Sequence, residues 1–306
     1  MAILRIENLT KDYVTGFTGK KFRALSNLNL EVEEGEIFGF LGPNGAGKTT
    51  TIKILLRIIF PTSGTAWIMD KKIGEAEQHK IGYMPENPYF YRFLTGREFL
   101  RFYARLANLP IEDAKKKAER LLDIVGLGFA AKTRLSEYSK GMVTRVGLAQ
   151  ALITDPTLLL LDEPMSGLDP IGRREIRDLI ASLKEEKKTI FFCSHILADI
   201  EMLCDRVAIL NKGELIKLGT VREMLSSGQS NYVLSLDKVP PETALQMKQS
   251  AAKYEEIGGI IHLTIPDRET AQKMAESAIS AGATIQEFRP DRGTLEDYFV
   301  REVGAK

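Results

Sequence analysis

The chain has 306 residues, 27% of them charged and 44% hydrophobic, which is typical of an ordinary soluble protein with room for one full α/β domain and a smaller second one. Forty-two basic and forty-one acidic residues leave a net charge of +1, which gives no support to nucleic acid as the main partner. Cys193 and Cys204 are too few for a disulfide framework, and no apolar stretch approaches the roughly 20 residues that span a bilayer.

The first part of the chain predicts short strands followed by a helix. Apolar residues alternate loosely in residues 2–9 and 22–32, which predicts two strands, and we interpret the polar segment 10–21 between them as a loop. The apolar run at 37–41 predicts a further strand, and the apolar spacing in 50–59 predicts a helix.

A glycine-rich loop lies between that strand and that helix. Residues 42–49 read GPNGAGKT, which fits the phosphate-binding pattern G-x-x-x-x-G-K-S/T. Glycines let the backbone curve around a phosphate, so that N–H groups and the next helix's N-terminus face the anion. Lys48 would reach the outer phosphates and Thr49 would hold Mg²⁺. A simple glycine turn is the alternative, which the flanking elements disfavour. The predicted nucleotide-binding residues are Asn44, Gly45, Ala46, Gly47, Lys48, Thr49 and Thr50.

The middle third of the chain predicts mainly helices. Residues 81–88 carry a strand into a loop that contains Glu86. Helical spacing of apolar residues in 95–109, in 112–125 and within 136–153 predicts three helices after that loop. This region therefore reads as a helical insertion in the α/β domain.

Two apolar strands with polar residues at their ends follow the insertion. The uninterrupted apolar run 157–161 is typical of a strand buried on both faces of a parallel sheet, and it ends in Asp162 and Glu163. The next such strand, 189–193, precedes His195. Because helical segments alternate with these strands, we predict the α/β class, with a parallel sheet and helices on both faces. The other elements of this alternation are helices at 169–185 and 196–203 and a strand at 206–210.

The side chains at these strand ends are candidates for hydrolytic chemistry, because ligands of open α/β sheets bind outside the carboxyl ends of the strands. Asp162 can hold Mg²⁺ through water, and Glu163 can polarise an attacking water. A neutral His195 could hydrogen-bond a γ-phosphate or that water. A helix cap for the acidic pair and a structural role for the histidine are the alternatives, and the phosphate loop favours chemistry over both.

An aromatic side chain near the N-terminus is a candidate for base binding. Tyr13 could stack on an adenine, since an aromatic face suits a base. Core packing is the alternative for this ring, and Phe17 and Phe22 are rivals for the same role.

After Gly213 the character of the chain changes. A hairpin strand and a short helix lead to a linker at 226–230, and a small α+β module with no catalytic cluster follows. We predict two domains, 1–225 with the helical region at about 87–155, and 226–306. The elements expected in the second are strands at 232–236, 260–265 and 284–288 and helices at 242–254, 268–281 and 295–300.

Four motifs in order carry a resemblance to a known family. The loop at 42–49 is followed by LLLLDEP at 158–164, SGLD at 166–169 and SH at 194–195. Together these motifs resemble the ATP-binding subunit of an ABC transporter over about residues 2–225. The resemblance implies a P-loop NTPase core with a parallel-rich sheet, N-terminal antiparallel strands and a helical subdomain, and an ATPase that uses ATP and Mg²⁺.

The resemblance also implies roles for single residues. Tyr13 corresponds to the aromatic residue that stacks on adenine, Glu163 to the general base and His195 to the switch histidine. Asp169 lies in the loop that crosses the interface between two subunits. The implied metal ligands are Thr49, Glu86 and Asp162.

The signature segment of the family departs from its usual form. It is usually LSGGQ and here reads YSKGM at 138–142. Ser139 and Gly141, which the family uses to bind the γ-phosphate held by the other subunit, are retained. Lys140 replaces the first usual glycine and Met142 the usual glutamine.

A second loop departs as well, because Glu86 stands where the family normally has glutamine. These replacements, and the segment TLEDYF at 294–299, resemble a branch that serves exporters of drugs, lipids, sugars or ions. The aromatic run at 89–93 follows the Glu86 loop, and we expect a membrane partner to dock there. Packing inside the helical region is the alternative for these rings.

One phosphate loop and one signature per chain imply a head-to-tail homodimer, because each nucleotide needs Lys48 from one copy and Ser139 from the other. We therefore expect an ATPase that powers separate transmembrane permease subunits and is peripheral on the cytoplasmic face of the membrane, with no nucleic acid partner. A soluble ABC-type ATPase acting on ribosomes or nucleic acid is the alternative. A regulatory module that does not hydrolyse ATP is a further one, which Lys48, Asp162, Glu163 and His195 disfavour.

Overall fold

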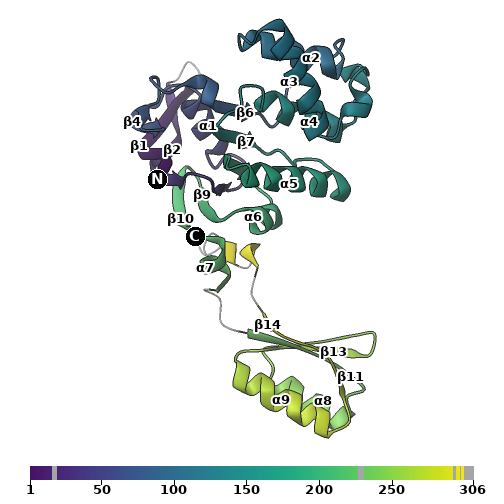
Figure 1. Cartoon of the computed structure of the whole chain (residues 1–306). Helices are drawn as coiled ribbons and strands as arrows, with labels where there is room; N and C mark the ends of the chain where they lie inside the picture. Colours follow the sequence, from purple (N-terminus) through teal and green to yellow (C-terminus); the bar gives the residue numbers. More distant parts are fainter. Residues whose placement is uncertain (16–18, 227–230, 292–293, 297, 300–306) are drawn as a thin grey trace. The chain divides into compact units, whose positions relative to one another are not determined.

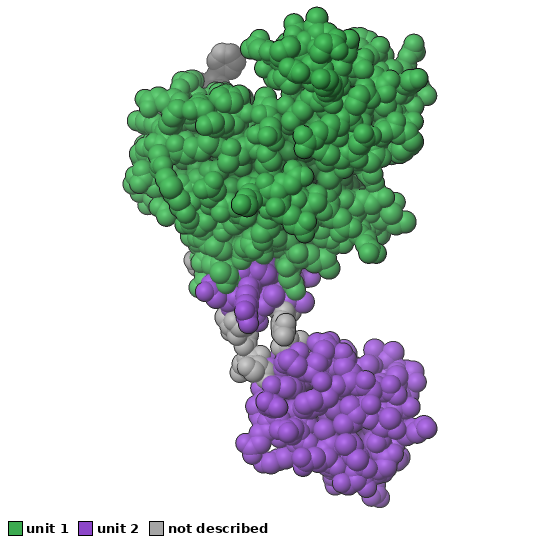
Figure 2. Space-filling model, in the orientation of Figure 1, with its two compact units in different colours: residues 1–220 green, residues 221–306 purple. Residues whose placement is uncertain are grey.

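The computed structural model describes residues 1–15, 19–226, 231–291, 294–296 and 298–299. The chain forms two compact units, residues 1–220 and residues 221–306 (Figure 2). The first unit contains two sheets and a helical region, and the second contains one sheet and its helices (Figure 1).

A four-stranded antiparallel sheet in the order β2-β1-β4-β5 begins the first unit. The prediction of a loop at 10–21 is wrong for most of that segment, because β1 and β2 continue through it and pair Tyr13 with Phe22. Strand pairing satisfies the backbone whatever the side chains are, and an ion pair of 2.8 Å between Arg23 and Asp12 joins the two strands. The strands are β1 (Ala2–Thr15), β2 (Lys20–Glu33), β4 (Ser63–Ile68) and β5 (Lys71–Lys72).

A six-stranded sheet in the order β10-β9-β3-β8-β7-β6 forms the centre of the first unit. Its pairs are parallel except for the edge strand β10, which runs antiparallel to β9. All residues of β3, β7 and β8 are buried, as expected for strands covered on both faces. The strands are β3 (Ile37–Leu41), β6 (Ile81–Met84), β7 (Leu158–Asp162), β8 (Thr189–Ser194), β9 (Arg206–Asn211) and β10 (Glu214–Thr220).

The main core lies between the two sheets. Phe38 and Phe191 stack with their ring centroids 5.7 Å apart, and this face of the six-stranded sheet packs with apolar residues of α1 and of the antiparallel sheet. On the opposite face Gly39 lets α6 approach, since a β-carbon at Gly39 would lie 3.1 Å from Ile200. The helices flanking the sheet are α1 (Lys48–Leu55), α5 (Pro170–Glu185) and α6 (Leu197–Leu203).

A helical region connects β6 to β7 and projects from the sheet (Figure 1). Thr95 caps its first helix through a capping box with Glu98, and Phe90 packs edge-on against Phe99 at 4.8 Å. The Tyr138 hydroxyl donates a buried hydrogen bond of 2.9 Å to the Ala130 carbonyl. The helices are α2 (Gly96–Leu106), α3 (Ile111–Ile124) and α4 (Lys140–Ala151), with 3₁₀ turns η2 (Gly128–Ala130) and η3 (Leu135–Glu137). A further 3₁₀ turn, η1 (Gln78–Lys80), comes directly before β6 and lies outside this region.

From β11 to β14 the second unit has the element order βαββαβ and an antiparallel sheet in the order β12-β13-β11-β14, the arrangement of ferredoxin-like folds. Helices α8 and α9 lie on one face of the sheet (Figure 1). The predicted helix 242–254 is too long, because Lys253 and Tyr254 begin β12, which pairs with β13. The elements are α7 (Val221–Ser226), β11 (Asn231–Asp237), α8 (Pro241–Ser250), β12 (Lys253–Ile257), β13 (Ile260–Ile265), α9 (Arg268–Ser280) and β14 (Thr284–Asp291).

The predicted α/β class is confirmed by the central parallel-rich sheet with its helices. Residues 227–230 of the predicted linker and part of the predicted helix 295–300 lie outside the described residues. Across the described ranges, every helix is too short or too polar to traverse a bilayer.

Candidate functional site

The phosphate loop joins the carboxyl end of β3 to α1. Gly45 and Gly47 have φ values of 81° and 109°, which favour glycine, and a β-carbon at Gly47 would lie 2.7 Å from the Ala24 carbonyl oxygen. The loop is closed by a hydrogen bond of 3.1 Å from the Ala46 N–H to the Pro43 carbonyl. The N–H groups of the first turn of α1 therefore face the inside of this loop, as an anion site requires.

Lys48 is buried, with 6% of its side chain exposed. Its ammonium group donates to the Gly42 carbonyl at 2.6 Å and lies 3.2 Å from Glu163 Oε1. Two of the predicted site residues, far apart in the sequence, are thus joined by a buried ion pair. Such a pair is stable only because each charge has its partner, and so removal of either one leaves the other unbalanced.

Glu163 turns back from the end of β7 toward β8. Its φ of 51° is unusual for a residue other than glycine, and its N–H donates to the Cys193 carbonyl at 3.0 Å. In this conformation Glu163 Oε2 lies 2.8 Å from His195 Nδ1 and accepts a second hydrogen bond from the His195 N–H at 3.3 Å. The carboxylate is therefore held between an ammonium group and an imidazole, a setting suited to a proton acceptor.

Asp162 lies beside the phosphate loop. Its Oδ2 accepts a hydrogen bond of 2.9 Å from the Thr49 hydroxyl, and burial raises the pKa of its carboxyl group, with the charges of Glu163 and Glu86 acting in the same direction. Its Oδ1 is buried and has no hydrogen-bond partner among the described residues. A free carboxylate oxygen next to a hydroxyl fits a hard cation such as Mg²⁺, which prefers oxygen ligands.

The donors for such a cation do not form a complete cage. Among the described residues, no group of three or more His, Cys, Asp or Glu side chains is arranged to hold a metal by itself. A site made from Thr49, Asp162 and ligand phosphates would fit this observation, because Mg²⁺ commonly binds through few carboxylates together with substrate oxygens.

A cavity of about 330 Å³ opens over the phosphate loop. Tyr13 and Phe22, paired across β1 and β2, line its edge, and the Tyr13 hydroxyl lies 3.5 Å from Thr50 Oγ1. Phe17, the other aromatic candidate, lies outside the described residues. The cavity brings together these predicted residues: Tyr13, Asn44, Gly45, Ala46, Gly47, Lys48, Thr49, Thr50, Glu86 and Glu163.

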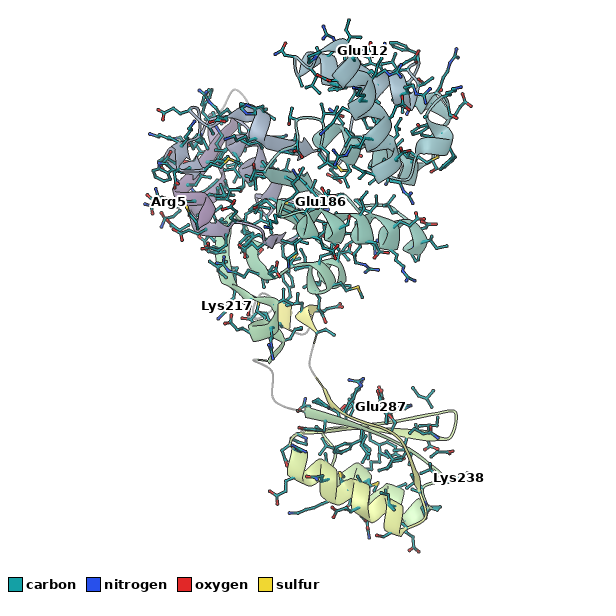
Figure 3. The ribbon with its side chains drawn as sticks, viewed as in Figure 1. Arg5, Glu112, Glu186, Lys217, Lys238 and Glu287 are labelled. Atoms are coloured by element: carbon teal, nitrogen blue, oxygen red, sulfur yellow. The ribbon has the colours of Figure 1, made fainter. Side chains whose placement is uncertain are left out.

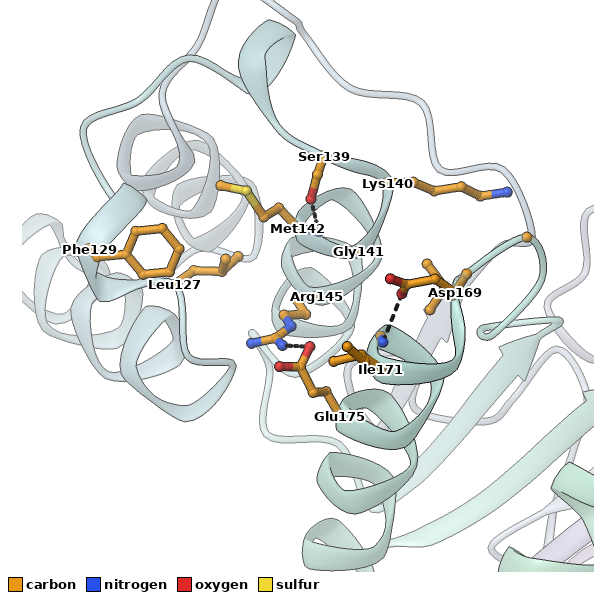
Figure 4. Close-up of a pocket in the computed structure, with 13 residues that line it drawn as sticks. Leu127, Phe129, Ser139, Lys140, Gly141, Met142, Arg145, Asp169, Ile171 and Glu175 are labelled. Atoms are coloured by element: carbon orange, nitrogen blue, oxygen red, sulfur yellow. Dashed lines mark hydrogen bonds and ion pairs between the residues drawn. The ribbon is translucent and has the colours of Figure 1, made fainter.

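Ser139, Gly141 and Asp169 are not in this cavity. They line a second one of about 550 Å³ where α4 and α5 begin, and the two cavities share no lining residue (Figure 4). Ser139 Oγ accepts a hydrogen bond of 3.3 Å from the Met142 N–H, and Asp169 Oδ1 accepts one of 2.9 Å from the Gly172 N–H. Each side chain thus caps a helix.

Sequence reasoning missed other residues of the second cavity. Arg145 of α4 forms an ion pair with Glu175 of α5 and donates to the Val125 carbonyl at 3.3 Å (Figure 4). Phe129 is 83% exposed at the rim of the cavity. Arg145 and Glu175 are 30 positions apart in the sequence, so no local sequence pattern indicates their contact. The contact depends on how α4 and α5 pack.

Comparisons with known proteins show the family of this chain. The family model described as ABC transporter matches residues 25–166. The chain is 43% identical to an uncharacterized ABC transporter ATP-binding protein of Synechocystis over 96% of this chain and 83% of that protein. It is 35% identical to a bacitracin transport ATP-binding protein of Bacillus licheniformis, over 99% and 97% respectively.

A solved structure has a similar fold. The dimeric post-hydrolysis state of an ATP-binding cassette bound to ADP and phosphate matches with a TM-score of 0.65 and 27% identity. The match covers 72% of this chain and 99% of the cassette. The predicted P-loop core is confirmed by this likeness in fold.

Proposed function

This chain belongs to the ABC transporter family as an ATP-binding subunit, an ATPase that powers a membrane transporter, and on that premise we propose which of its residues bind and hydrolyse ATP. The observation that carries the proposal is the position of Glu163 between Lys48 and His195. This position places Glu163 beside the phosphate loop as a proton acceptor, and it places His195 where it can orient the Glu163 carboxylate. Figure 3 draws the side chains of the described residues on the ribbon.

Nucleotide binding uses the first cavity. The N–H groups of residues 44–50 surround the phosphates, and Tyr13 stacks on the adenine with Phe22 beside it. Lys48 exchanges the Gly42 carbonyl and Glu163 for the outer phosphates. Once Lys48 contacts the phosphates, the Glu163 carboxylate is available to accept a proton.

Mg²⁺ would be held by Thr49 and Asp162, with Glu86 at the rim of the cavity. When bound, it would neutralise phosphate charge that develops during the reaction. The free Oδ1 of Asp162 supports this assignment, because it is a buried oxygen that lacks a partner among the described residues.

Hydrolysis uses Glu163. A water attacks the γ-phosphorus, Glu163 accepts a proton from that water, and the bond to the ADP oxygen breaks. His195 orients the carboxylate through its hydrogen bonds of 2.8 Å and 3.3 Å.

The second cavity supplies the other half of a composite site. We assign Ser139 and Gly141 to the γ-phosphate held by a second copy, and the loop before Asp169 to the interface between the copies. A β-carbon at Gly141 would meet nothing within 4 Å, so this part of the surface is open to a ligand. The assignment requires a head-to-tail homodimer, and the dimeric state of the related cassette supports it.

The membrane partner would dock on the helical region. Tyr89, Tyr91 and Phe93 are 88%, 44% and 71% exposed, and Tyr91 contacts both Phe93 and Phe102. Exposed aromatic side chains gathered in one segment are typical of an interaction surface. We assign it to a separate permease, which would hold this chain on the cytoplasmic face of the membrane.

The direction of transport and the second domain are part of the same proposal. We propose an exporter, because the sequence resembles the exporter branch and a relative is named for bacitracin transport. Residues 1–225 would be the ATPase domain, with its helical subdomain at about 87–155, and 226–306 an accessory domain. The relatives support this function over an ATPase acting on ribosomes or nucleic acid.

Glu163→Gln tests the assignment of the base. The amide keeps the size of the side chain but accepts no proton, so ATP hydrolysis should fall by at least about 100-fold. ATP should still bind and should hold the variant as a dimer, measured by phosphate release and by light scattering after size exclusion. Normal turnover by this variant would contradict the assignment.

A further inference from the structure

The nucleotide cavity has more negative than positive charge. Glu163 and Glu86 line it and Asp162 lies directly behind, while Lys48 is its lysine. A triphosphate adds further negative charge, and Mg²⁺ offsets only part of it. Positive charge supplied by another molecule would therefore strengthen the binding of a triphosphate in this cavity.

Lys140 is a positive charge without an ion-pair partner among the residues that the structure describes. It is the first residue of α4, it is exposed, and it lines the second cavity between Ser139 and Gly141. In the same cavity Arg145 is paired with Glu175, and Asp169 accepts a hydrogen bond from Gly172. Lys140 is thus the cation that this surface can offer to another molecule.

The position of the Lys140 side chain keeps its charge at the surface. The chain extends from the start of α4 toward the loop before Asp169 (Figure 4). It lies over Gly167, where a β-carbon would collide with the ammonium group. The glycine leaves room for the lysine, and the side chain is directed along the rim of the cavity and not back onto α4.

We propose that Lys140 of one copy completes the nucleotide site of the other, where its ammonium group faces the terminal phosphate and offsets the charge of Glu86. The inference rests on the head-to-tail dimer proposed above, in which the second cavity of one copy covers the first cavity of its partner. An excess of carboxylates on one surface then meets an unpaired lysine on the other, which is electrostatic complementarity between two copies. Lys140 is a binding residue in trans, and it has no part in nucleotide binding within its own chain.

The test uses the full chain with Glu163→Gln, so that ATP is not consumed. Lys140→Met keeps an unbranched side chain that reaches Gly167 up to its Cε position, and it removes the ammonium group and its charge. We expect ATP-dependent dimerisation, measured by analytical ultracentrifugation, to weaken by about tenfold or more. The affinity of the monomer for ADP should not change. Lys132→Met, at an exposed lysine that lines neither cavity, should leave both quantities unchanged.

Two further variants separate charge from packing. Lys140→Arg should retain dimerisation within about threefold, because it keeps the charge. Adding Glu86→Gln to Lys140→Met should recover part of the loss, since the carboxylate that the lysine offsets is then gone. Raising the salt concentration should weaken dimerisation of the chain that retains Lys140 more than dimerisation of the Lys140→Met variant.

The outcomes are distinct. Equal dimerisation with and without Lys140→Met would overturn the inference, and so would a lower affinity of the monomer for ADP. Loss in Lys140→Arg as large as in Lys140→Met, or no coupling to Glu86→Gln, would overturn the role of the charge. If the Glu163→Gln chain itself fails to dimerise with ATP, the proposed dimer fails and not the role of Lys140 alone.

Discussion

The nucleotide cavity and the helical region differ in how far their functional side chains are exposed and in what those side chains contact. Around the phosphate loop, Lys48 and Glu163 are only 6% and 7% exposed and are paired with each other. In the helical region, Tyr89 and Phe93 are 88% and 71% exposed, and Ser139 is satisfied by the backbone of its own helix. The charged side chains of the first region are paired inside one chain, whereas the second region presents groups to other molecules.

The difference indicates that the residues proposed for hydrolysis and the residues proposed for association lie in different regions of the chain. A buried, hydrogen-bonded base keeps its geometry, which hydrolysis requires. An exposed surface costs little to change, and substitutions there act on association more than on folding. We therefore expect substitutions in the cavity to affect stability and turnover together, and substitutions in the helical region to separate them.

Asp162→Asn should have the largest effect. Turnover should fall by about 10- to 100-fold, because the carboxylate that would orient the metal is lost. Stability of the nucleotide-free chain should rise instead. Burial raises the pKa of Asp162 above its ordinary 3.8, so its contribution to the free energy of unfolding is present below that value and is lost as the pH rises through the raised pKa.

Urea unfolding of the nucleotide-free chain at several pH values checks this sign. The stability advantage of Asp162→Asn over the parent chain should grow as the pH rises above 3.8 and then level off. With ATP and Mg²⁺ the order should reverse, because the parent chain binds the ligand more tightly. A variant that is less stable than the parent at neutral pH without ligand would contradict the comparison.

Tyr89→Asp should have the next largest effect, confined to association. The ring is 88% exposed, so the free energy of unfolding should change by no more than about 0.5 kcal/mol. Binding to the permease should weaken by about 2 kcal/mol, or roughly 30-fold, as at an interface hot spot. Co-purification with the membrane subunit and coupled transport are the measurements.

The control for this variant is Ile111→Asp, which places the same charge on a residue 60% exposed at the start of α3. It should leave association unchanged, and an acidic residue in the first turn suits the helix. If Tyr89→Asp keeps both co-purification and coupled transport, the docking surface is elsewhere.

Tyr138→Phe should have the smallest effect. It tests a residue of the helical region that is buried and not exposed. Its hydroxyl is buried and donates to the Ala130 carbonyl, so its removal should lower the free energy of unfolding by about 1 kcal/mol. Tyr89→Phe, which removes a hydroxyl in solvent, should cost nothing measurable in the same urea experiment. Equal stability of both variants would show that the helical region does not depend on this bond.

The sequence predicted the fold class and the order of the elements, because buried parallel strands and glycine loops have strong local patterns. The sequence-based predictions were wrong where pairing with a distant segment of the chain determines the secondary structure. Most of segment 10–21 is polar but forms strand, because β1 pairs with β2. The predicted helix 242–254 ends early, because Lys253 and Tyr254 belong to β12, which pairs with β13. The motif residues could be named in advance, yet the pairing of Lys48 with Glu163 and of Arg145 with Glu175 depends on packing and could not.

The backbone of Glu163 restricts how this position can change by mutation. A φ of 51° suits glycine, asparagine or aspartate, whereas the contacts to Lys48 and His195 require a carboxylate on a two-carbon arm. Aspartate would relax the backbone but its shorter side chain would not span both partners. Glutamine would keep the reach and lose the base. We therefore expect few residues to be tolerated at position 163 without loss of either the backbone conformation or the contacts to Lys48 and His195.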